Sequence, residues 1–283
     1  LICHFFQKKC DFKISFGWAG DFLDLYKLDL QKRSRLVFLK KASFYIYFKL
    51  FKKTLNVVDL FCPISTHLDK KLRLNFKIDC PTFPIPESAT RLFLERGKKN
   101  FNDFDNREIV YIGAICEERD TEFLIKTISF VAKTHPDIKL KIIGWFRSEK
   151  YKNKLETLVS ELDIGKNIIF YGRVDFNDIP RILKTAYLGI SNIPPEPYFI
   201  TSTPTKVIEY LSLGLPVIAN YEIFDQDYIL RHSKGGIRVK YSTLDFSKAI
   251  CWFLDNEAKT IKMAKLGRKW IMKNRTYESL SFD

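Results

Sequence analysis

The sequence predicts an α/β protein with two Rossmann-like, doubly wound domains, of which the N-terminal one is short or truncated. Three observations lead to this fold class. After residue 107, short apolar runs alternate with longer segments of helical periodicity, several of the runs end in glycine, and 46% of the 283 residues are hydrophobic. Such alternation is typical of βαβ units around a parallel sheet, and this length suits one large or two medium domains.

Six apolar runs in the second part are predicted to be buried strands. Each has five or six residues, and they occupy 108–113, 139–144, 167–172, 187–191, 215–220 and 236–240. The segments between them are predicted to be helices at 120–133, 149–162, 179–185 and 204–213, with further helices after residue 240. Helices between consecutive parallel strands cover both faces of the sheet, which makes the fold doubly wound.

The first part is less regular and resembles the tail of a second α/β domain. Strands are expected at 13–16 and 57–62, and helices at 34–55 and 65–72. The polar stretch 97–106 is the best candidate for a linker. We therefore expect a partial Rossmann-like domain with its linker at 1–106 and a second Rossmann-like domain with C-terminal helices at 107–283. A complete first domain would need about 150 residues, so either the chain is truncated or the domain is reduced.

Composition limits the function classes. The net charge is +14, most of it in the first 106 residues, which favours phosphate-bearing partners such as phosphorylated substrates, anionic lipid or nucleic acid. The sequence contains no run of about 18 uncharged apolar residues, so no transmembrane helix is predicted. No signal peptide is visible. Six scattered cysteines are typical of buried thiols in a reducing compartment, so we expect a cytoplasmic protein. The four histidines do not cluster, so no metal site is predicted.

The segment 202–219, S-T-P-T-K-V-I-E-Y-L-S-L-G-L-P-V-I-A, carries the sharpest pattern. Thr203 is a good N-cap and Pro204 a good first helical residue. The free N–H groups near Thr205 and Lys206 would then form an anion site at the helix start. Glu209 follows one turn later, where its carboxylate could accept two hydrogen bonds from a ribose diol. The alternative is an ordinary crossover helix with an exposed Lys206–Glu209 pair.

This segment resembles the P-T-K-x-x-E-Y-x-x-x-G-x-P-V-I signature of retaining GT-B glycosyltransferases of the large group 1, or family-four, type. The resemblance implies that Glu209 contacts the ribose of a sugar nucleotide, while Thr205 and Lys206 at the helix start hold its diphosphate. Residues 111–120, Y-I-G-A-I-C-E-E-R-D, resemble the family's Y-x-G-x-x-x-x-x-R-G/D stretch. That likeness implies that Gly113 and Arg119 also approach the diphosphate.

Three further likenesses are less specific. Residues 167–174 resemble the strand that leads to the nucleobase pocket, which implies a role for Arg173. Residues 17–24 resemble a D-x-R-D segment of some relatives, which implies that Asp21 or Asp24 faces the acceptor. The bland alternatives are a strand-end turn at Gly113, solvated arginines, and a plain polar loop at 17–24.

The sequence departs from the family pattern at one position. Many relatives carry two glutamates in an E-x7-E arrangement, and the position eight residues before Glu209 is Thr201. The first glutamate of the pair usually lies near the donor sugar. Glu196, just upstream, is a weak candidate for part of that space.

Residues 31–58 contain eight Lys or Arg and no acid, with aromatic residues interleaved. A basic helix with an aromatic face can lie on an anionic membrane surface or bind nucleic acid. Its aromatic residues could also be core. These three interpretations stay open.

Together these features predict a glycosyltransferase that moves a sugar from a nucleoside-diphosphate sugar to an unknown sugar or lipid-linked acceptor. The resemblance implies retention of configuration, a nucleotide-sugar-binding domain at 107–283 and an acceptor-side domain at 1–106. We expect no cofactor or metal, because the helix start, Arg119 and Lys206 would stabilise the leaving-group charge. We expect no nucleic acid partner, although a basic nucleic-acid-binding protein is the remote alternative. The nearer alternative is a non-catalytic subunit or inactive fragment that only binds the nucleotide sugar.

Overall fold

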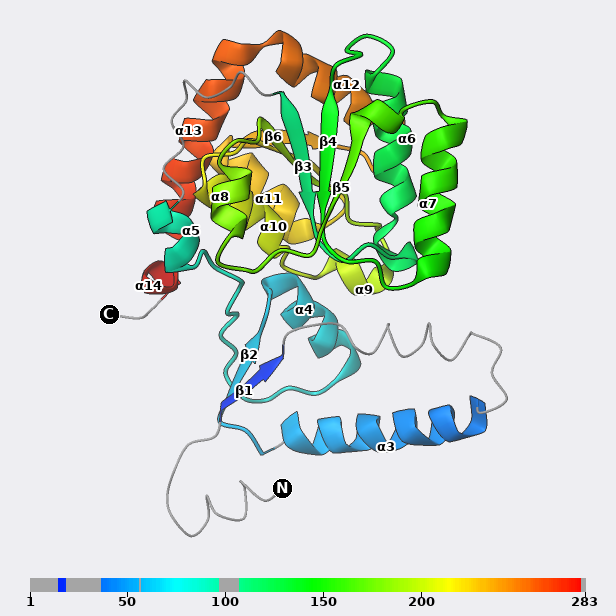
Figure 1. The fold of residues 1–283 in the computed structure, drawn as a ribbon. Helices are drawn as coiled ribbons and strands as arrows, with labels where there is room; N and C mark the ends of the chain where they lie inside the picture. The colour runs from blue at the N-terminus through cyan, green and yellow to red at the C-terminus, as the bar shows by residue number, and fades with distance from the viewer. Residues whose placement is uncertain (1–14, 19–36, 56, 97–106, 281–283) are drawn as a thin grey trace. The chain divides into compact units, whose positions relative to one another are not determined.

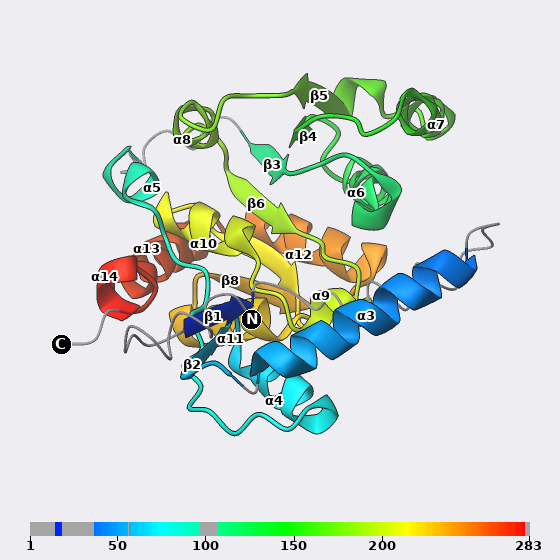
Figure 2. The ribbon, with the colours of Figure 1, turned by 90° about the horizontal axis from the view of Figure 1, so that it is seen from below.

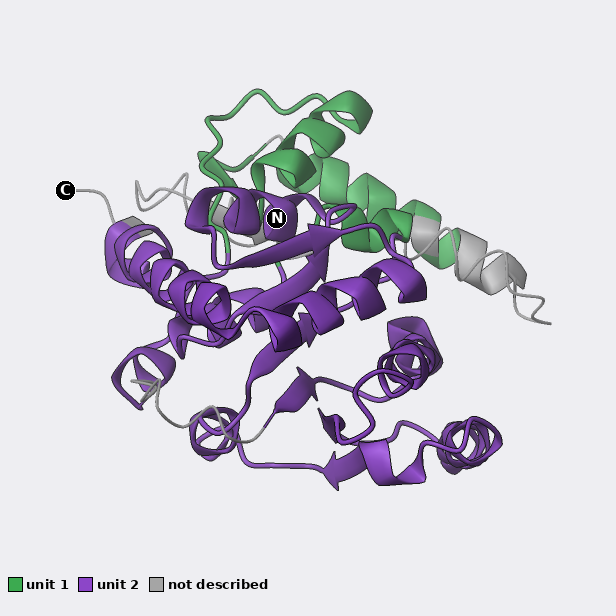
Figure 3. Cartoon of the chain, turned by 90° about the horizontal axis from the view of Figure 1, so that it is seen from above, with its two compact units in different colours: residues 1–86, 196–203 green, residues 87–195, 204–283 purple. Residues whose placement is uncertain are grey.

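The computed structural model of the chain describes residues 15–18, 37–55, 57–96 and 107–280. It divides into two compact units, shown in Figure 3. Unit 1 consists of residues 1–86 and 196–203, and unit 2 of residues 87–195 and 204–283. The predicted linker 97–106 lies outside the described residues, as do Asp21 and Asp24.

Unit 2 contains a six-stranded parallel sheet of order β5-β4-β3-β6-β7-β8. Its strands are β3 (Glu108–Ile112), β4 (Lys139–Ile143), β5 (Ile168–Gly172), β6 (Leu188–Ser191), β7 (Val217–Asn220) and β8 (Gly236–Val239). All six strands were predicted, each to within two residues at either end. The first three strands extend in one direction from β3 and the last three in the other, so the strand order reverses between β3 and β6. In sheets of this kind the crevice at such a reversal is the usual ligand site.

Helices cover both faces of this sheet, as Figures 1 and 2 show. One face carries α6 (Thr121–Val131), α7 (Glu149–Glu161) and α12 (Thr243–Asp255). The other carries α5 (Arg91–Arg96), α8 (Ile179–Leu183), α10 (Thr205–Ser212), α11 (Phe224–Ser233) and α13 (Glu257–Asn274), with the short α14 (Tyr277–Leu280) after it. The doubly wound α/β fold predicted for this part is confirmed.

The strand residues alternate between two hydrophobic cores. Ile109 and Tyr111 of β3 lie in the core beneath α6, α7 and α12. Val110, between them, lies in the core on the opposite face, with Val207 and Tyr210 of α10. This two-residue period follows from strand geometry, and it explains why nearly every residue of these strands is apolar.

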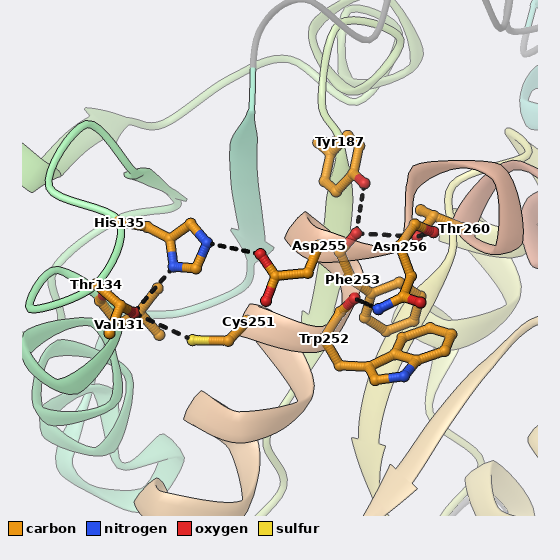
Figure 4. Close-up of polar contacts among 10 residues, drawn as sticks. All are labelled: Val131, Thr134, His135, Tyr187, Cys251, Trp252, Phe253, Asp255, Asn256 and Thr260. Carbon is orange, nitrogen blue, oxygen red and sulfur yellow. Dashed lines mark hydrogen bonds and ion pairs between the residues drawn. The ribbon is translucent and has the colours of Figure 1, made fainter.

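The edge of the sheet at the amino ends of the strands is held by a polar cluster, drawn in Figure 4. His135 Nδ1 lies 3.0 Å from Thr134 Oγ1, and its Nε2 lies 3.2 Å from Asp255 Oδ1 at the end of α12. Tyr187 Oη donates to the Phe253 carbonyl oxygen over 2.6 Å. These bonds tie the segments before β4 and β6 to α12.

Unit 1 contains β1 (Ser15–Trp18) and β2 (Leu60–Pro63), which pair in parallel, with α3 (Val37–Leu55), α4 (Thr66–Asn75) and α9 (Pro197–Ile200). As predicted, Ser65 caps α4, and its side chain accepts from the Leu68 N–H. The basic helix α3 is divided. Phe51 and Leu55 are buried against Phe76, whereas Tyr45, Ile46 and Leu50 are exposed. Among the described helices, none combines the length and the apolar character that crossing a bilayer requires.

Residues 196–203 join unit 1 from a distant part of the sequence. Ser65 Oγ donates to the Thr201 carbonyl oxygen over 2.8 Å, and Thr203 Oγ1 donates to that of Ile64 over 3.0 Å. Lys71 Nζ donates to the Pro197 carbonyl oxygen over 3.3 Å. The chain therefore enters unit 1 a second time before it returns to unit 2 and begins α10.

The division also differs from the expected boundary at residue 106, because residues 87–96 pack within unit 2. The Ala89 N–H donates to the Arg275 carbonyl oxygen over 2.8 Å. Arg275 also donates to the Glu87 carbonyl oxygen and forms a buried ion pair with Asp225. Arg275 and Asp225 lie more than a hundred positions after residues 87–89 in the sequence, so local patterns did not indicate these contacts.

Candidate donor-binding site

The amino end of α10 lies just after the strand-order reversal. The helix begins at Thr205, with Pro204 as its N-cap residue in an extended conformation and no side-chain cap. The prediction that Thr203 caps this helix is wrong, because the helix begins one residue later than expected and Pro204 occupies the N-cap position. The Thr203 hydroxyl donates to the Ile64 carbonyl oxygen. Without a side-chain cap, the first N–H groups of α10 remain available to an anion, as the helix dipole favours.

The Lys206 side chain, near the start of this helix, packs over an aromatic ring. Its Nζ lies 4.8 Å above the centre of the Tyr111 ring. Burial lowers the pKa of Lys206 to about 7, and the nearby positive charge of Arg119 acts in the same direction. The ammonium group is therefore held in place, and a neighbouring negative charge would favour its protonated form.

Gly113, directly after β3, makes this arrangement possible. Its φ is +154°, and a Cβ atom there would lie 3.0 Å from Tyr111 Oη and 3.1 Å from Lys206 Cε. Any larger residue would displace the lysine. Gly144, after β4, is tighter still, because its Cβ would lie 1.8 Å from the Gly113 carbonyl oxygen. The two glycines bring the carboxyl ends of β3 and β4 close together.

Glu209 lies one turn further along α10 and is partly buried. Burial raises its pKa to about 7; the charge of Lys206 opposes this shift and that of Glu87 adds to it. Within the described part of the chain, no ion pair joins Glu209 to Lys206, so the exposed pair of the alternative interpretation is not formed. The carboxylate is therefore not committed to the lysine.

Arg119 belongs to a 3-10 turn, Glu117–Arg119, between β3 and α6. Its charge lowers the pKa values of both Lys206 and Tyr111, which places it beside them. The turn ends at Asp120, which adopts the left-handed conformation with φ 47°. The structure thus brings Gly113, Arg119, Lys206 and Glu209 together at the carboxyl end of β3.

Two residues distant in the sequence hold Asp120 in this unusual conformation. Tyr241 Oη donates to Asp120 Oδ2 over 2.8 Å, while Asn192 Nδ2 donates to the Asp120 carbonyl oxygen over 3.3 Å. Asp120 Oδ1 accepts from the Phe123 N–H and caps α6. A left-handed residue usually needs such support. No local sequence pattern indicated Tyr241 or Asn192.

A pocket of about 630 Å³ opens at the carboxyl ends of β3, β4 and β5. Arg173 lies at this pocket with its guanidinium 5.8 Å from the centre of the Trp145 ring. The remaining lining is mostly apolar: Ile112, Gly113, Ile143, Gly144, Val174, Asp175, Phe176 and Ile179. Gly113 thus lies both at this pocket and beside Lys206, whereas Thr205 and Glu209 do not line the pocket.

Thr201, at the position where many relatives have glutamate, belongs to unit 1 and is 5% exposed. Its hydroxyl has no hydrogen-bond partner within the described residues. Across those residues no group of three or more His, Cys, Asp or Glu side chains is arranged to hold a metal ion.

Residues 95–270 match the model of the family described as glycosyl transferases group 1. An uncharacterized glycosyltransferase of Haemophilus influenzae is 24% identical over 172 residues, which cover 60% of this chain and 46% of that protein. The chain spans less than half the length of the curated relatives it matches.

Two solved structures cover 99% of this chain. Sucrose-phosphate synthase from Thermosynechococcus elongatus has a TM-score of 0.72 at 17% identity, with 68% of its own chain covered. Anabaena HepE in complex with UDP has a TM-score of 0.71 at 12% identity, with 72% covered. These likenesses confirm the expected GT-B class of fold. With well over half of its length matched by the family model, the chain belongs to the group 1 glycosyl transferases.

Proposed function

We propose that this protein binds a nucleoside-diphosphate sugar at the start of α10 and transfers the sugar, with retention, to an acceptor. One observation carries the proposal. An uncapped helix start, two cationic side chains and a carboxylate one turn away meet at the strand-order reversal, beside a mostly apolar pocket. A diphosphate, a ribose and a base need these three environments in this order.

Each residue then has a role. The N–H groups at Thr205 and Lys206, with the charges of Lys206 and Arg119, would bind the diphosphate. Glu209 would accept hydrogen bonds from the ribose hydroxyls, and Arg173 would lie beside the base. Gly113 allows the backbone to approach the phosphates. Fixed positive groups at the leaving oxygen stabilise the charge that develops there, so the reaction needs no metal ion in this proposal.

The acceptor is proposed to lie at a membrane surface beside α3. The exposed part of α3 combines Tyr45, Ile46 and Leu50 with Lys49 and Lys53. Such a surface suits an acceptor held at an anionic membrane, as in the synthesis of cell-surface polysaccharide or glycolipid. The second candidate function is donor binding without turnover. Thr201 favours it, because a hydroxyl cannot supply the charge of the glutamate found there in many relatives.

The first test is a binding screen by calorimetry with UDP, GDP and ADP. We expect one of them to bind in the micromolar range, and UDP is the first choice because HepE was solved with it. Hydrolysis or transfer of the matching nucleotide sugar would support the enzyme, and tight binding without either would support the second candidate. If none of the three diphosphates binds, both functions are wrong.

Donor binding should also change the protonation of the site. A sugar nucleotide brings negative charge to Lys206, whose pKa is lowered to about 7, and so raises that pKa. At about pH 8 the free lysine is mostly neutral and the bound one charged, so binding takes up protons. At about pH 6 the lysine is charged in both states, whereas Glu209, with its pKa near 7, releases protons when ribose hydroxyls favour the carboxylate.

Calorimetry in phosphate and Tris buffers measures this proton exchange, since the two buffers have different ionisation enthalpies. We expect uptake at the higher pH and release at the lower. Lys206→Arg keeps the charge but does not titrate, and it should bind without uptake. Equal enthalpies in both buffers at about pH 8, with the wild-type protein fully bound, would contradict the proposed contact between Lys206 and the diphosphate.

A further inference from the structure

The outward face of α13 carries a basic surface that takes no part in the proposed donor site. It consists of Lys262, Lys265, Leu266, Lys269, Met272 and Lys273, all exposed, and is called the α13 stripe below. Spacings of three and four residues place these side chains on one side of the helix. The stripe therefore presents four lysines in a row along most of α13.

The opposite face of α13 is fixed to unit 2. Ala264, Gly267 and Ile271 are buried, and a Cβ atom on Gly267 would lie 2.6 Å from Leu211 Cδ2. Arg268 donates to the carbonyl oxygens of Ser212 and Leu94. Because the helix is held by close packing and by this arginine, it cannot turn the lysines inward.

All the charged side chains of the stripe are positive. The single acidic residue of α13 is Glu257, in its first turn. Leu266 is 39% exposed and Met272 is 53% exposed, so aliphatic surface accompanies the lysines. A shallow depression lined by Lys265, Arg268, Lys269, Met272 and Lys273 exposes mostly carbon atoms. A positive row around an apolar floor matches the boundary between anionic headgroups and acyl chains.

We propose that the α13 stripe docks unit 2 onto an anionic lipid surface. The lysines contact headgroup phosphates, while Met272 and Leu266 reach the acyl boundary. Nucleic acid fits less well. The stripe has no aromatic side chain to stack on a base, and Arg268, the only nearby arginine in α13, already binds main-chain oxygens.

The test is co-sedimentation of the full chain with vesicles of equal parts phosphatidylglycerol and phosphatidylcholine. The stripe variant carries Lys262→Ala, Lys265→Ala, Lys269→Ala and Lys273→Ala, and alanine keeps the helix propensity. The matched control loses the same charge at dispersed exposed positions: Lys150→Ala, Lys166→Ala, Lys184→Ala and Lys248→Ala. Both variants keep α3 and the donor site intact, so unchanged nucleotide binding shows that each has folded.

We expect the stripe variant to partition about six hundredfold more weakly than the wild type, since each of the four lysines near an anionic surface contributes roughly a factor of five. The dispersed control should keep most of its binding, and vesicles of phosphatidylcholine alone should bind neither protein. Equal partitioning of the two variants overturns the proposal. So does a stripe variant that loses affinity for a 20-nucleotide DNA strand (about one full site on such a surface) yet keeps its vesicle binding.

Discussion

Replacing Glu209 with glutamine should weaken nucleoside diphosphate binding about a hundredfold without destabilising the fold. Hydrogen bonds to a charged acceptor contribute about 1.5–3 kcal/mol each, and the amide both loses the charge and offers only one acceptor oxygen. A loss of about 2.7 kcal/mol corresponds to a factor of about one hundred. Calorimetry at about pH 8, where the carboxylate is ionised, gives the dissociation constants directly.

The direction of the change in melting temperature caused by Glu209→Gln follows from the pKa of Glu209. Burial raises the pKa of Glu209 from its ordinary value of 4.5 to about 7, so the folded protein binds more protons than the unfolded chain between these two pH values. Its contribution to stability is therefore present at low pH and is lost as pH rises through that window. Glutamine lacks this dependence. At about pH 8 the variant should unfold at the same temperature as the wild type or higher.

Two controls make the result specific to the ribose. Glu156→Gln changes an exposed glutamate of α7 and should leave binding unchanged. The 2′-deoxy form of the nucleotide should bind the wild type more weakly, but it should bind Glu209→Gln almost as well as the ribonucleotide does. If the deoxy substitution costs both proteins the same affinity, Glu209 does not contact that hydroxyl, because independent changes add.

Gly144→Ala should be the most destabilising single substitution near the site. Its Cβ would lie 1.8 Å from the Gly113 carbonyl oxygen and 2.9 Å from the Gly113 carbonyl carbon. Main-chain atoms cannot rotate away as a side chain can, so β3 and β4 must separate. We expect a loss of about 3 kcal/mol or more, which lowers the melting temperature by roughly 6–12 °C in a protein of this size.

Gly165→Ala is the matched control, since a Cβ atom there meets nothing within 4 Å. Its melting temperature should be unchanged or slightly higher. Gly144→Ala should also lose donor affinity, because displacing Gly113 moves the surface against which Lys206 packs. A variant that melts like the wild type would show that β3 and β4 are not as close at this point as described.

The sequence predicted unit 2 well because its signals are local. Apolar runs such as 139–144 and punctuation such as His135-Pro136 are set by neighbouring residues, and the parallel order then follows from connection rules. The candidate residues Gly113, Arg119, Lys206 and Glu209 were also proposed from sequence, because each belongs to a recognisable local pattern at or just after a strand end or a helix start.

What could not be predicted depends on contacts between distant segments. Lys206 looks like a surface lysine until Tyr111 and Gly113 are placed beneath it. Thr203 is a good N-cap residue, but Pro204 occupies the N-cap position and the Thr203 hydroxyl donates to the Ile64 carbonyl oxygen. Residues 87–96 belong to unit 2 through Arg275. The residues next to each of these positions in the sequence do not indicate its partner.

The return of residues 196–203 to unit 1 affects how the protein is made. During synthesis, residues 1–86 emerge from the ribosome long before residues 196–203. That later segment supplies α9, the Thr201 carbonyl oxygen that accepts from Ser65 and the Thr203 hydroxyl that donates to Ile64. Unit 1 therefore cannot complete its hydrogen bonding until four strands of unit 2, β3 to β6, have also been translated. Domains normally fold as units in order of synthesis, but here the first unit must wait for the second, and a fragment cut at residue 106 would lack part of its own structure.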